Sequence, residues 1–584
     1  MDKNQYSSNY EHAKAEADKA DQQIIEALQE GKSFRVEAGA GSGKTYSLNK
    51  AIEWLQSNKW AEYNKRKQNI VCITYTNAAV DVITERLPKD SFIIPSTIHS
   101  FAWNAIKQYQ SFLINAVKTD SNFIIDHQDE SDEISEVTYT LGHRYIENGI
   151  RFLYHNEVLD LFCKLLDNAK FRHIFSSKYP LILIDEYQDS YNPIIERFIK
   201  YFISENKAPQ FGFFGDAWQT IYQSNKACGI IEHGNLKVIE KKSNFRSAPK
   251  IVELLSILRP SLPQISAIDD FQGEVTVITC EDYTGVRRTD RSFKDDLPSE
   301  ELKIRLTKIT EKIAQDIASD EKMKVLMITH NVLAMQQGYE KLLYILKDSL
   351  KNKEDPFLLF FMNIVEPIYN ALETSNMQLL FDTLKIKRYP ITKKSEKSKW
   401  KIFQKRLEKA RSKKAIDIIE IIYQMKLIPT SPELDKWYGI YHNAPETIYF
   451  SDTSVQSFLD LDYSQFLAAI DFLYPEALFS TEHGVKGEEY ENVVFVISKG
   501  WNLYQFEKFV PLFTKESDIP EKDKPSFERN RNLFYVCCSR PKKRLFLFVS
   551  IPIDDKFKSF LLNLVGEKNY FTYTQYLQKK TNLT

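Results

Sequence analysis

The chain has 584 residues, with 78 Lys and Arg balanced against 79 Asp and Glu. This length predicts about three to four domains. The formal net charge of −1 excludes a globally basic nucleic-acid-binding protein, so any nucleic acid would have to meet local patches. We expect no membrane-spanning helix, because no apolar stretch has the required length, and no signal peptide. The six cysteines are scattered without metal-ligand spacing, which predicts reduced thiols in a cytoplasmic protein.

The first informative segment is FRVEAGAGSGKTYSL, which begins at Phe34. FRVEA predicts a strand and TYSLNKAIEWLQ predicts a helix, so the glycines between them form a loop that opens a helix. Such a loop points backbone N–H groups at an anion. The pattern is that of a Walker A phosphate-binding loop, with a Lys for the β- and γ-phosphates and a Thr hydroxyl for Mg²⁺. The predicted loop comprises Ala38, Gly39, Ala40, Gly41, Ser42, Gly43, Lys44 and Thr45.

A second segment, YPLILIDEYQDS, follows about 140 residues later. Residues 181–184 predict a buried strand, and two acids follow it directly. Carboxylates at the carboxyl end of a parallel strand lie in the ligand crevice. We therefore expect Asp185 to hold Mg²⁺ and Glu186 to activate the attacking water. The two segments together predict a site for a nucleoside triphosphate, which metabolite kinases and GTPases also contain.

Further segments distinguish between these classes. CITYTNAAVDVITERL and STIHSFA lie between the two phosphate-site segments, and GDAWQTIY, SNFRS, TEHGVKGEEYENVVFV and LFYVCCSRPKKRL follow them in order. From Gln23 to Arg540 these segments resemble the UvrD/Rep-like superfamily 1 DNA helicases. A metabolite kinase would leave the segments around Thr76, His99 and His483 unexplained.

The resemblance implies roles on the nucleotide side. Gln23 matches the glutamine that reads adenine, and Phe245 matches an aromatic residue that stacks on it. Tyr46 stands where the family often has an Arg, and Glu489 would accept from the ribose. Arg246 and Arg540 would act as arginine fingers from a second RecA-like domain, and Gln219 would sense the γ-phosphate. The resemblance thus adds Gln219, Arg246 and Arg540 to Lys44 and Glu186 as catalytic residues, with ATP and Mg²⁺ as cofactors.

The resemblance also implies a DNA-binding side. Aromatic side chains stack on bases without regard to sequence, and hydroxyl, amide and imidazole groups donate to phosphate or sugar. After Ile221 and Tyr222 the family usually continues with a Trp and an Arg, which are absent here, so Trp218 is a substitute platform or else an interface residue. The predicted DNA-binding residues are Tyr75, Thr76, Asn77, Thr97, His99, Trp218, Tyr222, Thr481 and His483.

The predicted fold is α/β, with two RecA-like P-loop NTPase domains whose parallel sheets are flanked by helices, each with a mainly helical inserted subdomain. Domain 1A takes residues 1–103 and 176–240 around subdomain 1B at 104–175. Domain 2A takes residues 241–339 and 473–584 around subdomain 2B at 340–472. Residues 385–414 carry 14 Lys or Arg and two acids, which indicates either a basic helical face for duplex DNA or a partner, or a solvated loop. Residues 120–136 hold seven acids, which favours a solvated acidic loop over a metal site.

The function that these predictions favour is an ATP-dependent DNA translocase or helicase, expected by resemblance to move 3′→5′ on single-stranded DNA or tailed duplex. The alternative is a DNA-stimulated ATPase switch that does not unwind but licenses a separate effector. DEYQD and SNFR also resemble the helicase-like subunit of Gabija-type phage-defence systems, which works with a separate nuclease, and this implies a role in antiviral defence. Only 44 residues follow Arg540, so we expect any DNA cleavage to belong to a partner.

Overall fold

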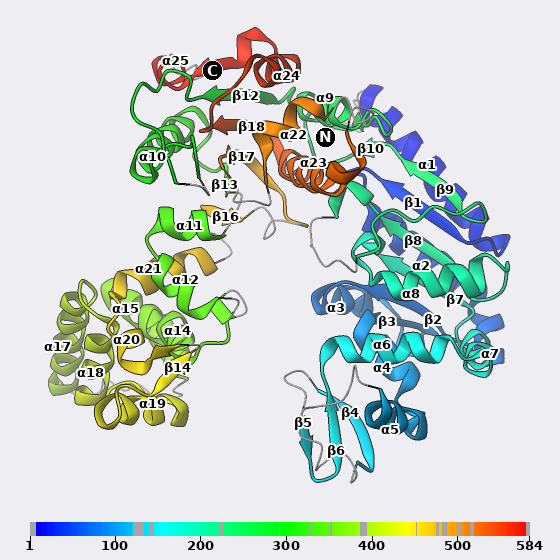
Figure 1. Ribbon diagram of the computed structural model, residues 1–584, viewed down its shortest axis with the longest axis horizontal. Coiled ribbons are helices and arrows are strands. Elements are labelled where there is room, and N and C mark those ends of the chain that lie inside the picture. Colours follow the sequence, from blue (N-terminus) through cyan, green and yellow to red (C-terminus); the bar gives the residue numbers. More distant parts are fainter. Residues whose placement is uncertain are drawn as a thin grey trace.

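The computed structural model describes residues 8–120, 134–140, 145–220, 227–290, 293–327, 330–347, 349–350, 353–385, 394–450, 452–474, 478–481, 487–499, 504–513 and 519–579. Two parallel sheets, each covered by helices, lie at the top and at the right of the view in Figure 1, and two further parts extend from them. The predictions for Tyr222, His483 and most of the acidic segment lie outside the described residues.

The first sheet has six parallel strands in the order β3-β2-β7-β8-β1-β9. The sequence explains why it is buried on both faces. In β7, Leu181 and Leu183 join one apolar core and Ile182 and Ile184 join the other, because successive side chains of a strand point to opposite faces. The strands are β1 (Phe34–Ala38), β2 (Ile70–Thr74), β3 (Ile93–Thr97), β7 (Leu181–Asp185), β8 (Gln210–Gly215) and β9 (Lys237–Lys241).

Helices cover both faces of this sheet. One core takes side chains from α1 (Ser8–Gln29), α2 (Lys44–Arg66) and α3 (Asn77–Arg86). The other takes side chains from α4 (Ile98–Ile106), α5 (Gln110–Thr119), α6 (His155–Leu166), α7 (Ala169–Lys178) and α8 (Asn192–Phe198). A parallel sheet requires this covering, because each helix that connects two parallel strands crosses back over a face of the sheet.

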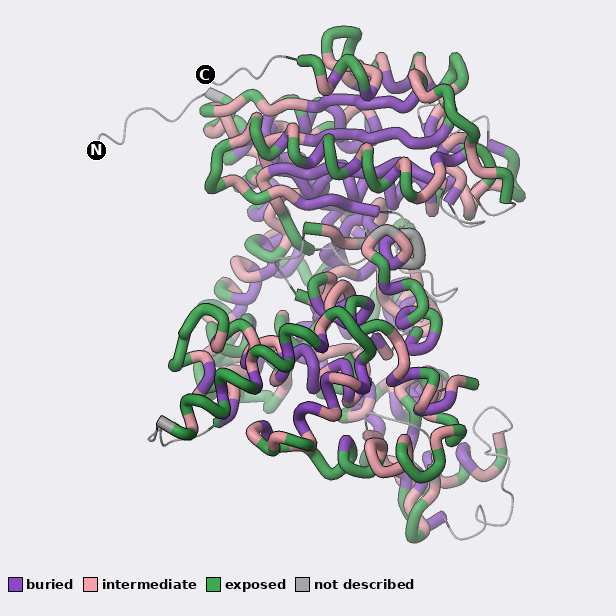
Figure 2. Tube along the Cα trace, turned by 90° about the vertical axis from the view of Figure 1, so that its left-hand side faces the viewer, coloured by how far each residue is buried: buried purple, intermediate pink, exposed green. Residues whose placement is uncertain are grey.

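The second sheet is also parallel, with six strands in the order β16-β13-β17-β18-β12-β19. Its strands are buried bands in the upper part of Figure 2, beneath helices whose outer residues are exposed. The strands are β12 (Glu274–Thr279), β13 (Met323–Met327), β16 (Phe479–Thr481), β17 (Tyr490–Ile497), β18 (Pro541–Val549) and β19 (Tyr570–Thr572). One face packs on α9 (Pro249–Leu258), α22 (Phe506–Phe509), α23 (Lys524–Cys538) and α24 (Asp555–Val565), and the other on α10 (Ser299–Asp316), α11 (His330–Gln337) and α25 (Tyr573–Gln578).

The two sheets confirm the predicted fold class. Below them, two inserted parts lie on opposite sides of the view in Figure 1. The first contains a three-stranded sheet that was not predicted, formed by β4 (Glu136–Tyr139), β5 (Tyr145–Glu147) and β6 (Ile150–Leu153). The second is mainly helical around its own core, with α12 (Glu340–Leu346), α14 (Pro356–Phe360), α15 (Glu366–Glu373), α16 (Met377–Leu384), α17 (Lys394–Ala410), α18 (Ala415–Met425), α19 (Pro432–Asn443), α20 (Val455–Leu459), α21 (Tyr463–Leu473) and the short pair β14 (Ile448–Phe450) and β15 (Thr453–Ser454).

Two short strands, β10 (Ser243–Asn244) and β11 (Ile265–Ser266), pair beside the junction of the two sheets. We call the first sheet with its helices and connecting loops the first unit, and the second sheet with its helices, its connecting loops and the pair of β10 and β11 the second unit. The first sheet takes strands from both sides of the first insertion, and the second from both sides of the second insertion. The exact domain boundaries stay a prediction.

Candidate functional site

The glycine-rich loop joins β1 to α2, as the sequence predicts. β1 ends at Ala38 and α2 begins at Lys44. Gly41 and Gly43 have φ angles of 71° and 77°, in the left-handed region that glycine enters without steric cost. The loop therefore turns tightly and leads directly into the N-terminus of a long helix, where backbone N–H groups and the helix dipole favour an anion.

Lys44 points across the loop toward the end of β7. Its Nζ lies 3.1 Å from Oε1 of Glu186. Burial lowers the pKa of Lys44, but the carboxylates of Glu186, Asp216 and Asp185 outweigh that effect, so its pKa lies above the ordinary value. Lys44 is therefore a fixed cation, and an entering phosphate would compete with Glu186 for it.

Glu186 adopts a left-handed backbone conformation with φ of 49°, which is uncommon for a residue with a side chain. Its N–H donates to Oδ1 of Asp185 at 3.0 Å. The turn after β7 therefore places two successive carboxyl groups beside the loop, although the side chains of consecutive strand residues would normally diverge.

Two arginines reach the same place from the second unit. Arg540 is 1% exposed, and its Nη2 donates to Oε1 of Gln219 at 3.2 Å. Burial, together with the nearby Arg246, lowers the pKa of Arg540 to about 10, which leaves it charged at neutral pH. Arg246 donates from Nη1 to the carbonyl of Ser539 at 3.2 Å. The predicted arginine fingers thus lie together on the wall opposite Lys44 and Glu186.

Glu489 forms an ion-pair cluster at this wall. Its Oε2 accepts from Nε of Arg246 at 2.9 Å, and its Oε1 lies 2.6 Å from Nζ of Lys542. Burial raises the pKa of Glu489, but Lys542 and Arg246 outweigh that effect and hold it below the ordinary value. The carboxylate that was predicted to accept from a ribose is therefore engaged by two cations.

A cavity of about 470 Å³ lies between the two units, within the range of small-molecule and cofactor sites. The first unit supplies the loop, Glu186 and Gln219, and the second unit supplies the arginines. The residues that line it are Gly39, Gly41, Ser42, Gly43, Lys44, Thr45, Glu186, Gln219, Phe245, Arg246, Ile268, Gly487, Glu489, Arg540 and Lys542.

Four predicted nucleotide-binding residues lie outside this lining. Ala38 is buried at the end of β1. The Ala40 N–H donates to the Tyr535 hydroxyl at 3.3 Å. Gln23 lies on α1, where its carbonyl accepts from Lys237 at 3.4 Å. Tyr46 is 60% exposed. The predicted contacts of Gln23 and Tyr46 with adenine stay predictions.

The predicted DNA-binding residues of the first unit follow strands β2 and β3, which are neighbours. Thr76 and Thr97 cap α3 and α4, accepting from the N–H groups of Ala79 and Ser100. Tyr75 is 53% exposed, and Asn77 is the first residue of α3. Because all strands of this sheet are parallel, these residues lie at the same edge as the glycine-rich loop.

His99 is engaged by a neighbouring histidine. Its ring stacks on that of His155, and the Tyr139 hydroxyl bonds to Nδ1 of His155 at 2.5 Å. Burial and the neighbouring His155 lower the pKa of His99 to about 4. In this arrangement His99 is neutral near pH 7, so it would donate to a phosphate as a dipole and not as a cation.

Trp218 lies between the two units. Its ring centroid is 4.0 Å from the Arg531 guanidinium carbon and 5.3 Å from that of Arg259, and its edge meets Tyr535. These contacts fit the interpretation of Trp218 as an interface residue. Stacking of Trp218 on DNA stays a prediction. Thr481 ends β16 at the edge of the second sheet, and its backbone pairs with Met327.

Comparison with known proteins agrees with this site. A family model described as an AAA domain matches residues 21–225. The chain is 23% identical to Gabija protein GajB of Bacillus cereus (strain HuB5-5), an alignment that covers 95% of this chain and 98% of that protein. It is 27% identical to the ATP-dependent DNA helicase Rep of Buchnera aphidicola, over 38% of this chain and 42% of that protein. It is 25% identical to the mitochondrial ATP-dependent DNA helicase HMI1 of Saccharomyces cerevisiae, over 52% of this chain and 48% of that protein.

The chain is similar to UvrD/Rep-like helicases. These relatives support a DNA helicase or ATPase function and an ATP-hydrolysing enzyme. The predicted resemblance to Gabija systems is also confirmed, by the alignment with Gabija protein GajB over nearly the whole chain. Within the part of the chain that the structure describes, no helix is both long and apolar enough to cross a membrane.

Three residues that line the cleft were not among the predicted site residues: Gly487, which lies within the segment TEHGVKGEEYENVVFV, Ile268 and Lys542. Lys542 follows Arg540 by two positions, in the run PKKR, so its closeness to a predicted finger was a usable signal. Ile268 lies just after β11, in a segment without a recognisable pattern, and only the folded chain brings it to the cavity.

The residues present fit a magnesium–nucleotide complex. Thr45 lines the cavity, and Asp185 is close enough to affect the pKa of Lys44. A hydroxyl, a carboxylate and phosphate oxygens are the hard ligands that Mg²⁺ prefers, and it commonly uses only one or two protein carboxylates. Thr45 and Asp185 would hold the ion beside the loop.

Proposed function

We propose that this protein is an ATP-dependent DNA translocase or helicase that moves 3′→5′ on single-stranded DNA. ATP is hydrolysed in the cleft between the two units. The observation that carries the proposal is the cavity itself, in which Lys44 and Glu186 of the first unit face Arg246 and Arg540 of the second. Transfer of a γ-phosphoryl group passes through a loose transition state that needs cations around its oxygens, and this lining supplies them from both sides.

Each residue has a distinct task in this proposal. The loop N–H groups and Lys44 bind the phosphates, and Glu186, once Lys44 is engaged by phosphate, accepts a proton from the attacking water. Arg246 and Arg540 stabilise the charge of the transferred group. Bound Mg²⁺ would neutralise charge on the β- and γ-phosphate oxygens.

Gln219 links hydrolysis to movement in this proposal. It contacts Arg540 across the interface, so its position depends on how the two units are placed. Tyr75, Thr76 and Thr97 would hold the strand at the edge of the first sheet. If grip on the strand depends on closure over ATP, each cycle of closing and opening moves the protein along the DNA.

A second candidate is a DNA-stimulated ATPase switch that does not unwind DNA but licenses a separate nuclease in antiviral defence. The alignment with Gabija protein GajB over 95% of this chain favours it, because the helicase named Rep matches only 38%. A nuclease subunit would then be the partner. Both candidates require the same ATP cleft.

One experiment separates the two candidates. ATP hydrolysis is measured with and without single-stranded DNA, and strand displacement is then followed on duplexes with a 3′ or a 5′ tail. Stimulation with displacement from the 3′ tail supports the helicase, and stimulation without displacement supports the switch. No stimulation by DNA contradicts both. Lys44→Ala serves as the control that removes hydrolysis in either case.

A further inference from the structure

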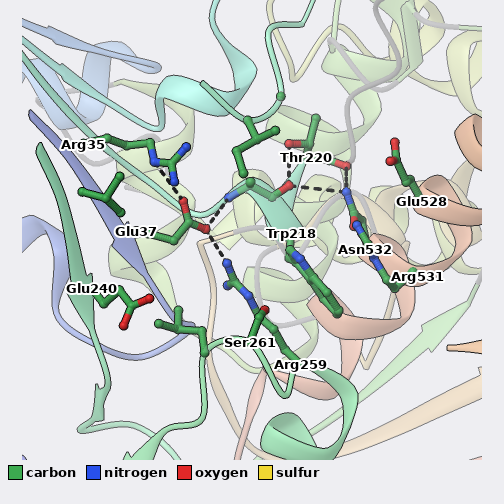
Figure 3. A pocket seen from close by; sticks show the side chains of 15 residues that line it. Arg35, Glu37, Trp218, Thr220, Glu240, Arg259, Ser261, Glu528, Arg531 and Asn532 are labelled. Atoms are coloured by element: carbon green, nitrogen blue, oxygen red, sulfur yellow. Dashed lines mark hydrogen bonds and ion pairs between the residues drawn. The ribbon is translucent and has the colours of Figure 1, made fainter. Parts of the chain in front are cut away.

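A buried cluster of charges joins the two units beside the ATP cleft (Figure 3). Glu37 lies on β1 and Asp216 directly follows β8, which are neighbouring strands of the first sheet. The two carboxylates are 6% and 0% exposed. The cation between them, Arg259, comes from the second unit, where it follows the end of α9, and it is 4% exposed.

Arg259 bridges both carboxylates. Its Nη1 donates to Oδ1 of Asp216 at 2.8 Å, and its Nη2 donates to Oε1 of Glu37. A planar guanidinium can make two such bonds at once, whereas an ammonium is a single point charge. Glu37 also accepts from the Tyr187 hydroxyl at 2.9 Å. Loss of the two bonds from Arg259 would leave at least one buried carboxylate without its cation.

Asp216 connects this cluster to the catalytic wall. Its Oδ2 accepts from Nε2 of Gln219 at 2.8 Å, and Oε1 of Gln219 accepts from Arg540 at 3.2 Å. A continuous chain of bonds therefore runs from Arg259 through Asp216 and Gln219 to Arg540. Arg259 and Arg540 belong to the second unit, whereas Asp216 and Gln219 belong to the first. This series of bonds is therefore complete only when the two units are correctly placed relative to each other.

Helix α23 holds the same turn from another side. Nδ2 of Asn532 donates to the carbonyls of Ala217 and Thr220, at 3.4 and 3.2 Å. Arg531, the preceding residue, faces the ring of Trp218. Figure 3 shows Asn532 beside Thr220, and the ring of Trp218 close to both Arg259 and Arg531. The turn that carries Gln219 is thus fixed by side chains of the second unit.

We propose that Arg259 is a positioning residue for hydrolysis, which aligns Asp216 and Gln219 with Arg540 when the two units close over nucleotide. The inference rests on the proposed ATPase function. It assigns to Arg259 an effect on the chemical step and not on nucleotide binding, because the residue lies outside the lining of the ATP cavity and acts through Asp216.

The test compares Arg259→Lys with Arg35→Lys in the full chain. Arg35 is a matched control: it is 6% exposed in the same cluster and lies 3.7 Å from Glu37. Arg35 also donates to the carbonyl of Ile231 within the first unit. We expect Arg259→Lys to lower kcat for DNA-stimulated hydrolysis about tenfold, with the KM for ATP changed less than about twofold. Arg35→Lys should lower thermal stability at most.

Glu37→Gln keeps the shape of the cluster while removing one of the two charges that Arg259 bridges. It carries the test if Arg259→Lys does not fold, with an expected loss of about threefold in kcat. The inference is overturned if the variants lose stability while kcat is unchanged, if they raise KM alone, or if Arg35→Lys lowers kcat equally. Wild-type protein that hydrolyses no ATP with DNA would overturn the proposed function instead, so the two failures are distinguishable.

Discussion

At the scale of single residues, the cleft is a set of competing ion pairs. Glu186 holds Lys44, and Glu489 holds both Arg246 and Lys542. A nucleotide would bring phosphate and ribose oxygens to the same cations. Binding would therefore exchange one set of ion pairs for another, so that the buried cations keep an anionic partner, while the displaced carboxylates of Glu186 and Glu489 are partly exposed to water.

The first prediction concerns Glu186→Gln. The substitution removes the proposed base and the carboxylate that pairs with Lys44. We expect kcat to fall about 10²- to 10⁴-fold, while ATP binds as tightly as before or more tightly, because Lys44 no longer has a competing anion. Steady-state hydrolysis and titration with a fluorescent nucleotide measure the two effects. Glu205→Gln, at an exposed position of the same unit, is the control, and hydrolysis retained in Glu186→Gln would contradict the assignment.

The second prediction concerns pH. The pKa of His99 is lowered to about 4, whereas a histidine in an unfolded chain has a pKa of about 6.5. Between these values the unfolded state binds more protons, so the free energy of unfolding falls as the pH is lowered from about 6.5 to 4. His99→Gln removes this contribution. Over this pH range the Tm of His99→Gln, measured by thermal unfolding, should fall by about 2 °C less than the Tm of wild type.

His173→Gln, which changes an exposed histidine on the surface of the first unit, is the matched control and should follow the wild-type curve. If wild type and His99→Gln lose stability in parallel as the pH is lowered, the half-buried pair of His99 and His155 does not titrate as the structure implies.

At the scale of elements, the structure of α17 distinguishes between the two interpretations of the basic segment at residues 385–414, a helical face or a solvated loop. Its Trp400, Phe403 and Leu407 are buried in the core of the helical insertion, a spacing typical of an amphipathic helix. Residues 394–410 of the segment are thus a docked helix and not a solvated loop. The opposite face exposes Lys397, Lys401, Lys405 and Lys409, which follow each other at intervals of four residues.

The third prediction tests this lysine row against duplex DNA. Phosphate contacts make affinity depend on salt, with a slope of about −0.9 in log–log units for each contact on B-DNA. Replacing the four lysines by Gln should therefore reduce the slope for tailed duplex by up to about 3 to 4. Affinity for single strands should change less. Fluorescence anisotropy across a salt series measures both, and an unchanged slope on duplex would assign the row to a protein partner or to solvent.

The elements also show what the sequence could predict. The loop at residues 38–45 and the acids after β7 are contiguous patterns with a local physical cause, so they could be read directly. Arg246 and Arg540 were placed by resemblance. Arg259 meets Glu37 222 positions away in the chain, and no local pattern marks such a contact. The strands of the small sheet are three or four residues long, too short for a clear period.

At the scale of the whole molecule, the two units share one cleft. The glycine-rich loop and Glu186 belong to the first unit, and the two arginines belong to the second. Several hydrogen bonds cross between the units. Among these, the Phe245 N–H donates to the Gly41 carbonyl at 2.9 Å and Asn244 donates to the Ala40 carbonyl at 2.9 Å. Since these bonds hold the glycine-rich loop itself, a change in the relative placement of the two units would move the loop at the position where phosphate would bind.

The central claim is that hydrolysis needs an arginine from the second unit. Single-turnover hydrolysis of ATP by Arg540→Ala, with single-stranded DNA and saturating ATP, tests it most directly. Lys543→Ala is the control, because Lys543 lies on β18, which begins directly after Arg540, but pairs with Glu321 outside the cleft. We predict that Arg540→Ala is slower than wild type by about 10³-fold or more, with nucleotide binding within a few-fold of wild type and Lys543→Ala unaffected. Turnover at the wild-type rate in Arg540→Ala would contradict the two-unit site.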